Sequence, residues 1–290
     1  MADILLLIMF IIGIYLFWQI LYDTGRFVTC TYVLPAEKIK KSCKIVLLAD
    51  LHGNSFGKDN SLLEQAIDSQ KPDVIMVAGD MITAGKKKDM THVAEFMNRI
   101  KAKYPVYYAD GNHEYRMALY PEQFGNAIRE YQHAVSGDGL KWLQNTSDIL
   151  EAYNIRVHGA MIDKKFYKRM ENIQMEEDYM EALLGRPEEG VYHILLAHNP
   201  EYFPLYAAWG ADLTLSGHVH GGMVRVPFWR RGVVSPKVSF FPKYDGGLFD
   251  ESGKKMILSR GLGVHTIPVR LFNPCEMVVI ELKSKEERQA

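Results

Sequence analysis

Short apolar runs, each followed at once by polar turn residues, recur along the middle of the chain. They are rich in Ile, Val, Leu and Tyr, and a Gly, Asp, Asn or His closes each one. Runs of this length between turn formers are typical of buried β-strands. We therefore predict strands at Lys44–Ala49, Asp73–Gly79, Pro105–Ala109, Ile155–Ala160, His193–Ala197 and Asp212–Gly217.

Segments with a helical period lie between these runs. In Met90–Lys103 the apolar residues fall on one face of a helix. In Ser61–Ser69 the opening serine is followed three residues later by Glu64, which is typical of a capping box. A further helix is expected at Pro200–Trp209. The alternation of strands and helices predicts a layered α/β fold.

The last third of the chain has a different character. Gly222–Gly247 is rich in Pro, Gly and aromatic residues, and Met277–Leu282 is another apolar run, so we expect a second, more antiparallel sheet there. Asp163–Gly190 is charged and rich in Met, and it interrupts the strand series. We expect it to be helical, either as a surface excursion or as a lid.

The N-terminus is apolar over the length of a membrane span. Ile4–Tyr22 contains one strongly polar residue, Gln19, and a helix of about 20 apolar residues crosses the hydrocarbon core. A cleaved signal peptide is disfavoured because no basic segment precedes the run and no small-residue cleavage site follows it. We predict a transmembrane anchor and flank at residues 1–28, a polar connector at 29–43, a globular domain at 44–282 and a charged tail at 283–290.

Charge and cysteine content narrow the function classes. The formal net charge is −1, which gives the whole molecule no attraction to nucleic acid. The cysteines Cys30, Cys43 and Cys275 are odd in number and form no C-x-x-C pair. This usage disfavours a thiolate zinc site and a disulfide scaffold, and we expect reduced thiols.

Polar residues able to bind metals follow five of the six predicted strands. The carboxyl ends of the strands in an open α/β sheet are where ligands collect, so these residues are expected to converge. They are Asp50 with His52, Asp80, Asn112 with His113 and Glu114, His198, and His218 with His220.

The chemistry of these donors points to divalent metals. Imidazoles and carboxylates without thiolates suit Mn, Fe, Zn or Co. The donors are too many for one tetrahedral site, but they suit two ions if one carboxylate bridges them. Such a pair of ions binds a phosphoryl group and activates a water for in-line attack. No G-x-S-x-G motif or P-loop competes. The pattern predicts a two-metal phosphoesterase that hydrolyses a phosphate ester or anhydride.

A family resemblance rests on the same motifs. In the order DLHG, GD, GNHE, a lone histidine after an apolar strand and GHVHGG, they resemble the calcineurin-like metallophosphoesterase superfamily over Lys44–Gly222. With the N-terminal anchor and the ending SRGLG…PVRLFNPCEMVVIELK at Ser259–Lys283, the chain is similar to the bacterial single-span members of the YkuE/YaeI-like group. The resemblance implies an α/β fold of two facing mixed β-sheets flanked by helices.

The resemblance also implies a role for each site residue. One metal would be held by Asp50, His52 and His220, and the other by Asn112, His198 and His218, with Asp80 as the bridge. His113 would not bind metal, but would donate a proton to the leaving group or stabilise the transition state. The phosphoprotein phosphatases carry G-D-x-x-D-R where this chain has GDMIT. That departure disfavours a phosphoprotein substrate and leaves the residue that orients His113 unassigned.

Three further residues are candidates for substrate contacts. Arg230 and Arg231 lie in an aromatic and basic run, Val226–Lys243, which either meets an anionic or lipid-like substrate or forms a hairpin with a solvated rim. His265 lies in a later glycine-rich loop. The histidines inside predicted strands, His158 and His193, are expected to be structural.

Membrane tethering favours a membrane-associated or amphiphilic phosphorylated substrate, and no nucleic-acid partner is expected. A two-metal nuclease of the same superfamily and a catalytically silent, membrane-tethered binding module remain as alternatives. Lys and Arg residues follow the anchor and none precedes it. This bias predicts a single-pass protein of the cell membrane with its catalytic domain in the cytoplasm.

Overall fold

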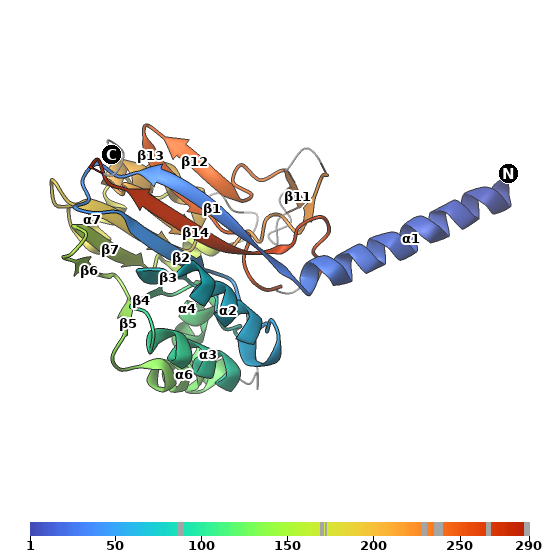
Figure 1. The fold of residues 1–290 in the computed structure, drawn as a ribbon, viewed down its shortest axis with the longest axis horizontal. Helices are drawn as coiled ribbons and strands as arrows, with labels where there is room; N and C mark the ends of the chain where they lie inside the picture. Colours follow the sequence, from blue (N-terminus) through green and yellow to red (C-terminus); the bar gives the residue numbers. More distant parts are fainter. Residues whose placement is uncertain are drawn as a thin grey trace.

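The computed structural model describes residues 1–85, 90–168, 171, 173–227, 231–234, 240–264 and 268–286. Within these ranges two six-stranded sheets face each other, and helices cover their outer surfaces (Figure 1). The α/β fold of two mixed sheets flanked by helices is therefore confirmed.

The first sheet contains both the first and the last strand of the chain, β1 (Phe27–Pro35) and β14 (Cys275–Lys283), as neighbours. Its order is β1, β14, β2 (Cys43–Leu48), β3 (Val74–Ala78), β4 (Val106–Ala109) and β5 (Leu140–Leu143). Strands β2 to β5 run parallel, while β14 runs antiparallel to β2. The helices that follow these strands are α2 (Ser61–Gln70), α3 (Thr91–Lys101), α4 (Asn112–Leu119), α5 (Pro121–Phe124) and α6 (Ala127–Val135), with the short helix η1 (Lys58–Asn60).

The second sheet is built mainly from the later part of the chain. Its order is β12 (Gly247–Glu251), β13 (Lys254–Leu258), β9 (Leu213–Ser216), β8 (Tyr192–Ala197), β7 (Ile155–Ala160) and β6 (Thr146–Leu150). Strands β7, β8, β9 and β13 run parallel, and β6 and β12 pair antiparallel at the two edges. The remaining elements are η2 (Lys164–Tyr167), α7 (Tyr179–Leu184), η3 (Pro200–Tyr202), α8 (Phe203–Trp209) and the small hairpin of β10 (Val224–Arg225) and β11 (Gly232–Val234).

The core consists of apolar layers on both faces of each sheet. Along β2, Ile45 and Leu47 belong to the layer between the sheets, whereas Val46 and Leu48 belong to the layer under α2, α3 and α6. Successive side chains of a strand point to opposite faces. A strand covered on both faces therefore reads as a continuous apolar run, which is why the six strands predicted from such runs are all present.

Strand β1 occupies part of the segment that we expected to be a connector. It pairs in parallel with β14 along its whole length, from Phe27 opposite Cys275 to Pro35 opposite Lys283. As an edge strand it alternates between partly buried and exposed side chains. It therefore lacks the continuous apolar run that marks the inner strands, and the prediction of a connector at 29–43 is wrong for this part.

The capping box predicted at the start of α2 is also wrong. Ser61 is already the first helical residue, and Asn60 before it has a left-handed backbone with φ 64°. Glu64 instead accepts hydrogen bonds from Arg99 Nε at 2.8 Å and Lys103 Nζ at 2.8 Å. The glutamate thus ties α2 to α3 rather than capping its own helix.

Two expectations for the later part of the chain need correction. The run at Met277–Leu282 lies in β14 of the first sheet, between β1 and β2, and not in a separate antiparallel sheet. Within the described residues of Asp163–Gly190, helical structure is limited to η2 and α7. Most of the described residues of that segment lie outside helices and strands, so the expectation that it is helical is wrong for them.

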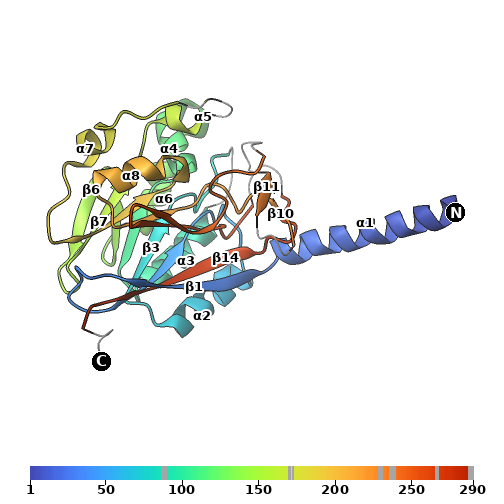
Figure 2. The ribbon, with the colours of Figure 1, turned by 90° about the horizontal axis from the view of Figure 1, so that it is seen from above.

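Helix α1 (Ala2–Thr24) extends away from the domain (Figures 1 and 2). Its 23 residues span about 35 Å at 1.5 Å per residue, which exceeds the ~30 Å hydrocarbon core of a bilayer. The apolar side chains along it are exposed, including Phe10 at 65% and Trp18 at 53%. By length and composition α1 is a candidate membrane span.

The last turn of α1 is joined to the domain through a buried carboxylate. Asp23 is fully buried and accepts hydrogen bonds from Gln19 Nε2, from Arg26 NH2 and from the backbone amide of Asn273. The adjacent β1 begins opposite the start of β14, and that end of β14 lies beside the carboxyl end of β2. The helix therefore leaves the domain at the edge where the predicted ligands of the first sheet emerge.

Candidate metal centre

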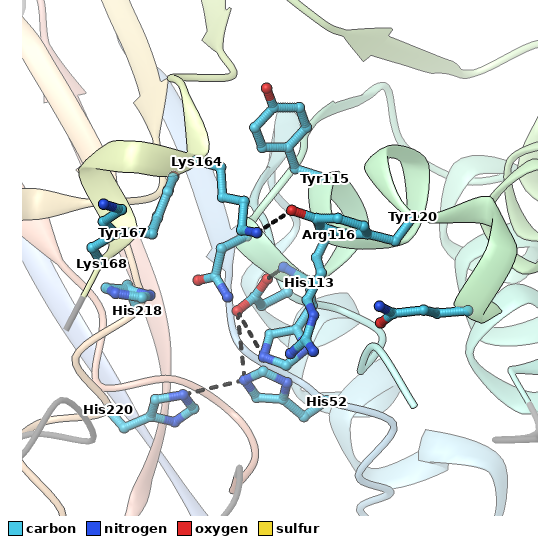
Figure 3. Close-up of a pocket in the computed structure, with 13 residues that line it drawn as sticks. His52, His113, Tyr115, Arg116, Tyr120, Lys164, Tyr167, Lys168, His218 and His220 are labelled. Carbon is cyan, nitrogen blue, oxygen red and sulfur yellow. Dashed lines mark hydrogen bonds and ion pairs between the residues drawn. The ribbon is translucent and has the colours of Figure 1, made fainter. Parts of the chain in front are cut away.

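Loops from both sheets bring the predicted ligands to one place, and Figure 3 shows His52, His218 and His220 among them. Asp50 follows β2, Asp80 follows β3, His198 follows β8, and His218 and His220 follow β9. Three groups of donor atoms each lie within 4.8 Å of one another: Asp50, His52 and His220; His52, Asp80 and His113; and Asp80, His198 and His218. The parallel order of the inner strands produces this convergence, since their carboxyl ends share one edge.

Asp80 lies between the groups. Its Oδ2 atom is 3.1 Å from His198 Nε2, 3.8 Å from His52 Nε2 and 4.0 Å from His113 Nε2. On one side, Asp50 Oδ1 is 3.5 Å from His220 Nε2. Two donor atoms that each lie about 2.1 Å from one ion are about 3–3.5 Å apart. The shorter separations thus match donors that share an ion.

The backbone at the site adopts conformations that are rare for residues with side chains. Five of the seven predicted ligands have positive φ: Asp50 at 52°, His52 at 51°, Asp80 at 55°, His218 at 77° and His220 at 52°. Such conformations cost energy and persist where the surrounding structure imposes them, which is common at functional sites.

Two glycines permit the close approach of the loops. At Gly79, which has φ 86°, an added Cβ would lie 2.3 Å from the Gly111 amide nitrogen. At Gly217 an added Cβ would lie 2.3 Å from Asp50 Oδ2. Any larger residue at these positions would push the ligand loops apart.

Hydrogen bonds at Nδ1 set the tautomers of two predicted ligands. His198 Nδ1 donates to the Ala78 carbonyl at 2.6 Å. The Thr83 hydroxyl donates to the His52 carbonyl, so its oxygen accepts from His52 Nδ1 at 3.1 Å. A neutral imidazole with its proton on Nδ1 presents a lone pair at Nε2. Both rings are thus prepared to bind a cation through Nε2.

The facing rings of His52 and His220 fit a cation. Their Nε2 atoms are 3.2 Å apart (Figure 3). His220 Nδ1 lies 3.3 Å from the Gly263 carbonyl, and the Arg270 guanidinium lies 3.5 Å from the same nitrogen. If the shorter contact is a hydrogen bond donated by Nδ1 of His220, both rings direct the lone pairs of Nε2 toward the same space. A positive ion bound there would relieve the repulsion between these lone pairs.

His113 has the opposite arrangement. Its Nδ1 accepts a hydrogen bond from the Ala84 amide at 2.9 Å, so the proton of the neutral ring is on Nε2. This nitrogen lies on the side of Asp80, and His113 lines the same cavity as His52, His218 and His220. The Ala84 amide is therefore the orienting partner that the sequence left unassigned, and His113 presents a donor where His52 and His198 present lone pairs.

Asn112 also fits a metal site. Its side-chain oxygen is buried and has no hydrogen-bond partner among the described residues. Asn112 lines the cavity together with Asp80 and His218. A buried polar atom without a partner is costly, and an amide oxygen facing a hard cation removes that cost. The residues of both predicted sets thus offer the oxygen and nitrogen donors that divalent ions require.

The two carboxylates differ in electrostatic environment. Burial, reinforced by the neighbouring charge of Asp80, raises the pKa of Asp50 although His198 opposes the shift. Burial also acts to raise the pKa of Asp80, but His198, His113 and His52 outweigh it and hold that pKa well below its ordinary value. For His198, burial acts to lower the pKa, and the Asp80 and Asp50 carboxylates reverse the shift and raise it. The site therefore gathers strongly interacting acids and imidazoles away from water.

Glu114 supports the loops that carry the predicted ligands. No role was assigned to it from the sequence. Its fully buried carboxylate accepts hydrogen bonds from the backbone amides of Asp80 at 2.9 Å, Gly111 at 3.0 Å and Ile82 at 3.3 Å. It also accepts from the Tyr108 hydroxyl at 2.9 Å. The glutamate thus joins the loops that follow β3 and β4, and the GNHE motif was the available signal.

Asn273 and Arg270 support the His220 loop. Asn273 Nδ2 donates to the His220 carbonyl at 2.8 Å. Arg270 is buried, and its guanidinium donates to the carbonyls of Gly263 at 2.6 Å and Arg260 at 2.7 Å. The backbone amide of Asn273 also donates to Asp23 Oδ2. Asn273 therefore joins the end of α1 to the predicted ligand loop that contains His220. Both residues lie in the PVRLFN segment of the C-terminal motif.

A cavity of about 540 Å³ opens above the cluster. Its inner wall contains predicted ligands and His113, and its outer wall comes from α4, α5 and η2. The outer wall consists of Tyr115, Arg116, Tyr120, Gln123, Lys164, Tyr167 and Lys168. None of these outer residues was predicted from the sequence, because they belong to no recognisable motif.

The predicted substrate contacts are not part of this cavity wall as far as the structure describes it. Arg231 pairs with Asp245, with Nε 3.2 Å from Oδ2, and donates to the Pro242 carbonyl. It is absent from the described lining of the cavity. Arg230 and His265 lie outside the described residues.

Comparison with known proteins places the chain in a family. Residues 43–222 match the calcineurin-like phosphoesterases. The protein therefore belongs to the calcineurin-like metallophosphoesterase family, whose members bind divalent metals, and its histidine and aspartate groups could hold them.

Named relatives include bacterial and animal proteins. The chain is 30% identical to the uncharacterized metallophosphoesterase Cj0846 of Campylobacter jejuni, over 86% of this chain and 61% of that protein. It is 24% identical to the uncharacterized metallophosphoesterase YkuE of Bacillus subtilis, over 83% of this chain and 79% of that protein. A zebrafish transmembrane protein with a metallophosphoesterase domain is 28% identical over 86% of this chain and 56% of that protein. The chain thus spans about three fifths of the Campylobacter relative.

Proposed function

We propose that this protein is a membrane-anchored phosphoesterase that uses two divalent metal ions to hydrolyse a phosphate ester or anhydride. One observation carries the proposal: seven donor residues of the right chemistry meet at the shared edge of the two sheets. Asp50, His52 and His220 would hold one ion, Asn112, His198 and His218 the other, and Asp80 would bridge them. The position of Asp80 Oδ2 between His52 and His198 supports the bridge.

When bound, the two ions supply Lewis acidity and a water of lowered pKa as the nucleophile. His113 then acts on the substrate rather than on the ions. Because the Ala84 amide occupies Nδ1, Nε2–H is directed at the leaving-group oxygen or at a phosphoryl oxygen. A donor placed in this way transfers a proton to the leaving group or stabilises the charge of the transition state.

The position of the anchor supports a substrate at the membrane surface. Helix α1 leaves the domain at the edge that carries Asp50, and the buried Asp23 joins it to the His220 loop through Asn273. With α1 in a bilayer, this connection holds the metal centre at a constant height near the lipid surface. A phosphorylated, amphiphilic molecule is the substrate that this position favours.

We place the domain in the cytoplasm on the charge bias around α1. Arg26, Lys38 and Lys40 follow the helix, and the cytoplasmic flank of a membrane span is enriched in Lys and Arg. The three cysteines are free thiols, which suits a reducing compartment. The test is a Lys285→Cys variant treated in intact cells with a membrane-impermeant thiol reagent. Labelling only after lysis is expected, and labelling of intact cells would place the domain outside.

Metal content and hydrolysis together test the main proposal. Full-length protein in detergent, loaded with Mn²⁺ and dialysed, is expected to hold two equivalents of metal and to hydrolyse 4-nitrophenyl phosphate. A truncated chain is unsuitable because it loses the Asp23 contact. Metal content of one equivalent or less would exclude the two-metal site. Two equivalents without hydrolysis of any ester in a phosphate panel would favour a silent binding module.

A further inference from the structure

The outer half of the cavity is cationic. Arg116 from α4, Lys164 from η2 and Lys168 just after η2 line it, and the described lining contains a single carboxylate, that of Asp80. Asp80 belongs to the metal set and lies at the inner end. The rim therefore presents positive charge that the site does not neutralise with its own wall.

Of these three cations, only Lys168 forms an ion pair within the described structure, so Arg116 and Lys164 are available to a ligand. Lys168 pairs with Glu171 at 3.0 Å. For Arg116 and Lys164 the described residues provide no carboxylate partner. Lys164 Nζ instead donates to the Tyr120 hydroxyl and lies 4.3 Å from the centre of that ring (Figure 3). A neutral phenol orients the ammonium group across the cavity without cancelling its charge.

The scissile phosphate does not need these cations. Two divalent ions would bring four positive charges, of which the Asp50 and Asp80 carboxylates would offset two, so the centre would hold positive charge of its own for the scissile phosphate. The cavity of about 540 Å³ also falls within the ~300–1,000 Å³ of ligand pockets. The space and charge at the rim are thus left for another part of the substrate.

The helix α4 sets where that part lies. His113 and Arg116 are three positions apart and both line the cavity, and residues at this spacing share one face of a helix about one turn apart. Tyr120 follows the helix on the same side. A leaving group that meets Nε2–H of His113 therefore extends along α4 toward Arg116 and Lys164.

We propose that Arg116 and Lys164 form a subsite for a second phosphate on the leaving group, so that the substrate is a phosphate ester or anhydride with two phosphates, such as an alkyl diphosphate. Arg116 would supply a planar pair of donors and Lys164 a point charge, which is a combination suited to phosphate oxygens. This inference rests on the proposed function of the metal centre and names the substrate class for it.

Binding of paired inhibitors tests the subsite. Methylphosphonate and methylenebisphosphonate are titrated calorimetrically into the full-length, Mn²⁺-loaded protein, and metal content is measured after each titration. The bisphosphonate is expected to bind more tightly by at least ~10-fold, as one charge-assisted contact provides. Arg116→Gln and Lys164→Met are each expected to reduce this ratio by about 10-fold. Lys165→Met removes the same charge one residue away, outside the cavity lining, and is the matched control with an unchanged ratio.

The outcomes separate this inference from the proposed function. A ratio that Arg116→Gln and Lys164→Met leave unchanged would overturn the subsite, as would an equal change in Lys165→Met. If the bisphosphonate removed metal from the protein, the binding ratio would change equally in all variants. Metal removal therefore cannot produce a ratio that falls in Arg116→Gln and Lys164→Met but not in Lys165→Met. Wild-type protein that binds both phosphonates but hydrolyses no phosphate ester would reject the proposed function and leave the subsite measurable.

Two substrates distinguish a lipid headgroup from a soluble diphosphate. Methyl diphosphate is supplied in solution and decyl diphosphate in phosphatidylcholine vesicles, with the protein reconstituted in the same vesicles. A higher kcat/KM for the decyl compound would assign the subsite to a lipid headgroup, and a higher value for the methyl compound to a soluble ligand. In both cases Lys164→Met must lower kcat/KM by about 10-fold, and hydrolysis indifferent to Lys164→Met and Arg116→Gln overturns the inference.

Discussion

Two of the buried histidine pairs in the described structure have similar spacing but different surroundings. His52 and His220 face each other with their Nε2 atoms 3.2 Å apart. His158 and His193 lie in adjacent strands, with Nε2 of the first 2.9 Å from Nδ1 of the second. Proximity and burial alone would not separate them.

The second pair forms a chain of hydrogen bonds that ends at a backbone carbonyl. His193 Nε2 donates to the Glu188 carbonyl at 2.8 Å, so its Nδ1 accepts from Nε2 of His158. His158 Nδ1 is buried and has no hydrogen-bond partner among the described residues. Protonation there would bury an unpaired charge, and burial, assisted by His193 and Arg156, lowers the pKa of His158 to about 3.

In the first pair, carboxylates and fixed tautomers change the chemistry. Asp50 and Asp80 lie within 3.8 Å of His52 Nε2, whereas the described structure shows no ion pair at the rings of His158 and His193. The Nδ1 atom of His52 is held by Thr83, which directs its Nε2 lone pair inward. A buried histidine pair becomes a metal site when acids surround it and the lone pairs converge, and it stays structural when the rings satisfy each other.

The strongest test removes the acid between the groups. Asp80→Ala is expected to lower metal content at both sites and to reduce hydrolysis to background, because its Oδ2 lies between His198 and His52. His52→Ala should chiefly weaken one site, and His158→Ala, the matched histidine of the structural pair, should leave two equivalents bound. Elemental analysis of the purified variants measures this. Full metal content in Asp80→Ala would contradict the bridge.

The next largest effect concerns the histidine with the opposite tautomer. His113→Ala is expected to keep near-normal metal content while kcat falls by ~10²–10⁴, the usual contribution of a general acid. The loss should shrink for substrates with an acidic leaving group such as nitrophenol. Steady-state kinetics on a series of leaving groups measures this. A loss that is constant across the series would argue for electrostatic support rather than proton donation.

A smaller effect is expected where the His220 loop is held from outside. Asn273→Ala removes the hydrogen bond to the His220 carbonyl, and loss of such a supporting contact typically weakens metal affinity by about 10–100-fold. Competition with a metal chelator measures this affinity. Asn154→Ala, which removes an asparagine bound to the Lys38 and Gly190 carbonyls away from the site, is the control and should leave the affinity unchanged.

The smallest effect separates the structural pair by pH. The folded pKa of His158, about 3, is below its ordinary value of about 6.5. The unfolded state therefore binds the extra proton first, and stability is lost as pH falls below about 6.5 toward 3. Between pH 6.5 and 5 the protonation of His158 in the unfolded state should lower the free energy of unfolding by about 2 kcal/mol, at about 1.4 kcal/mol per pH unit.

Thermal unfolding of wild type and His158→Leu at pH 7 and pH 5 measures this effect. At pH 7 the variant should be less stable by about 1–3 kcal/mol, because His193 Nδ1 loses its donor. At pH 5 the difference should narrow or reverse, while metal content stays normal. A difference that widens on acidification would show that His158 is charged in the folded protein.

The order of residues along the chain determined the inner strands, the candidate membrane span and the donor residues. Continuous apolar runs specify strands that are covered on both faces, and Asp50, Asp80 and His198 follow such runs directly. A residue at a strand end can be placed without knowing the neighbouring strands, because parallel strands share an edge. The candidate span at α1 could also be predicted from the sequence, because its composition and length alone define it.

Tertiary structure alone decided what holds and surrounds these donors. The tautomers of His52 and His113 depend on Thr83 and Ala84, which reach the rings only after the loops pack. The rim residue Lys164 comes from a segment with no informative period, and it enters the cavity because η2 lies against α4. Edge strand β1 escaped prediction for a related reason: its stability comes from pairing with β14, which lies at the other end of the chain and leaves no local pattern.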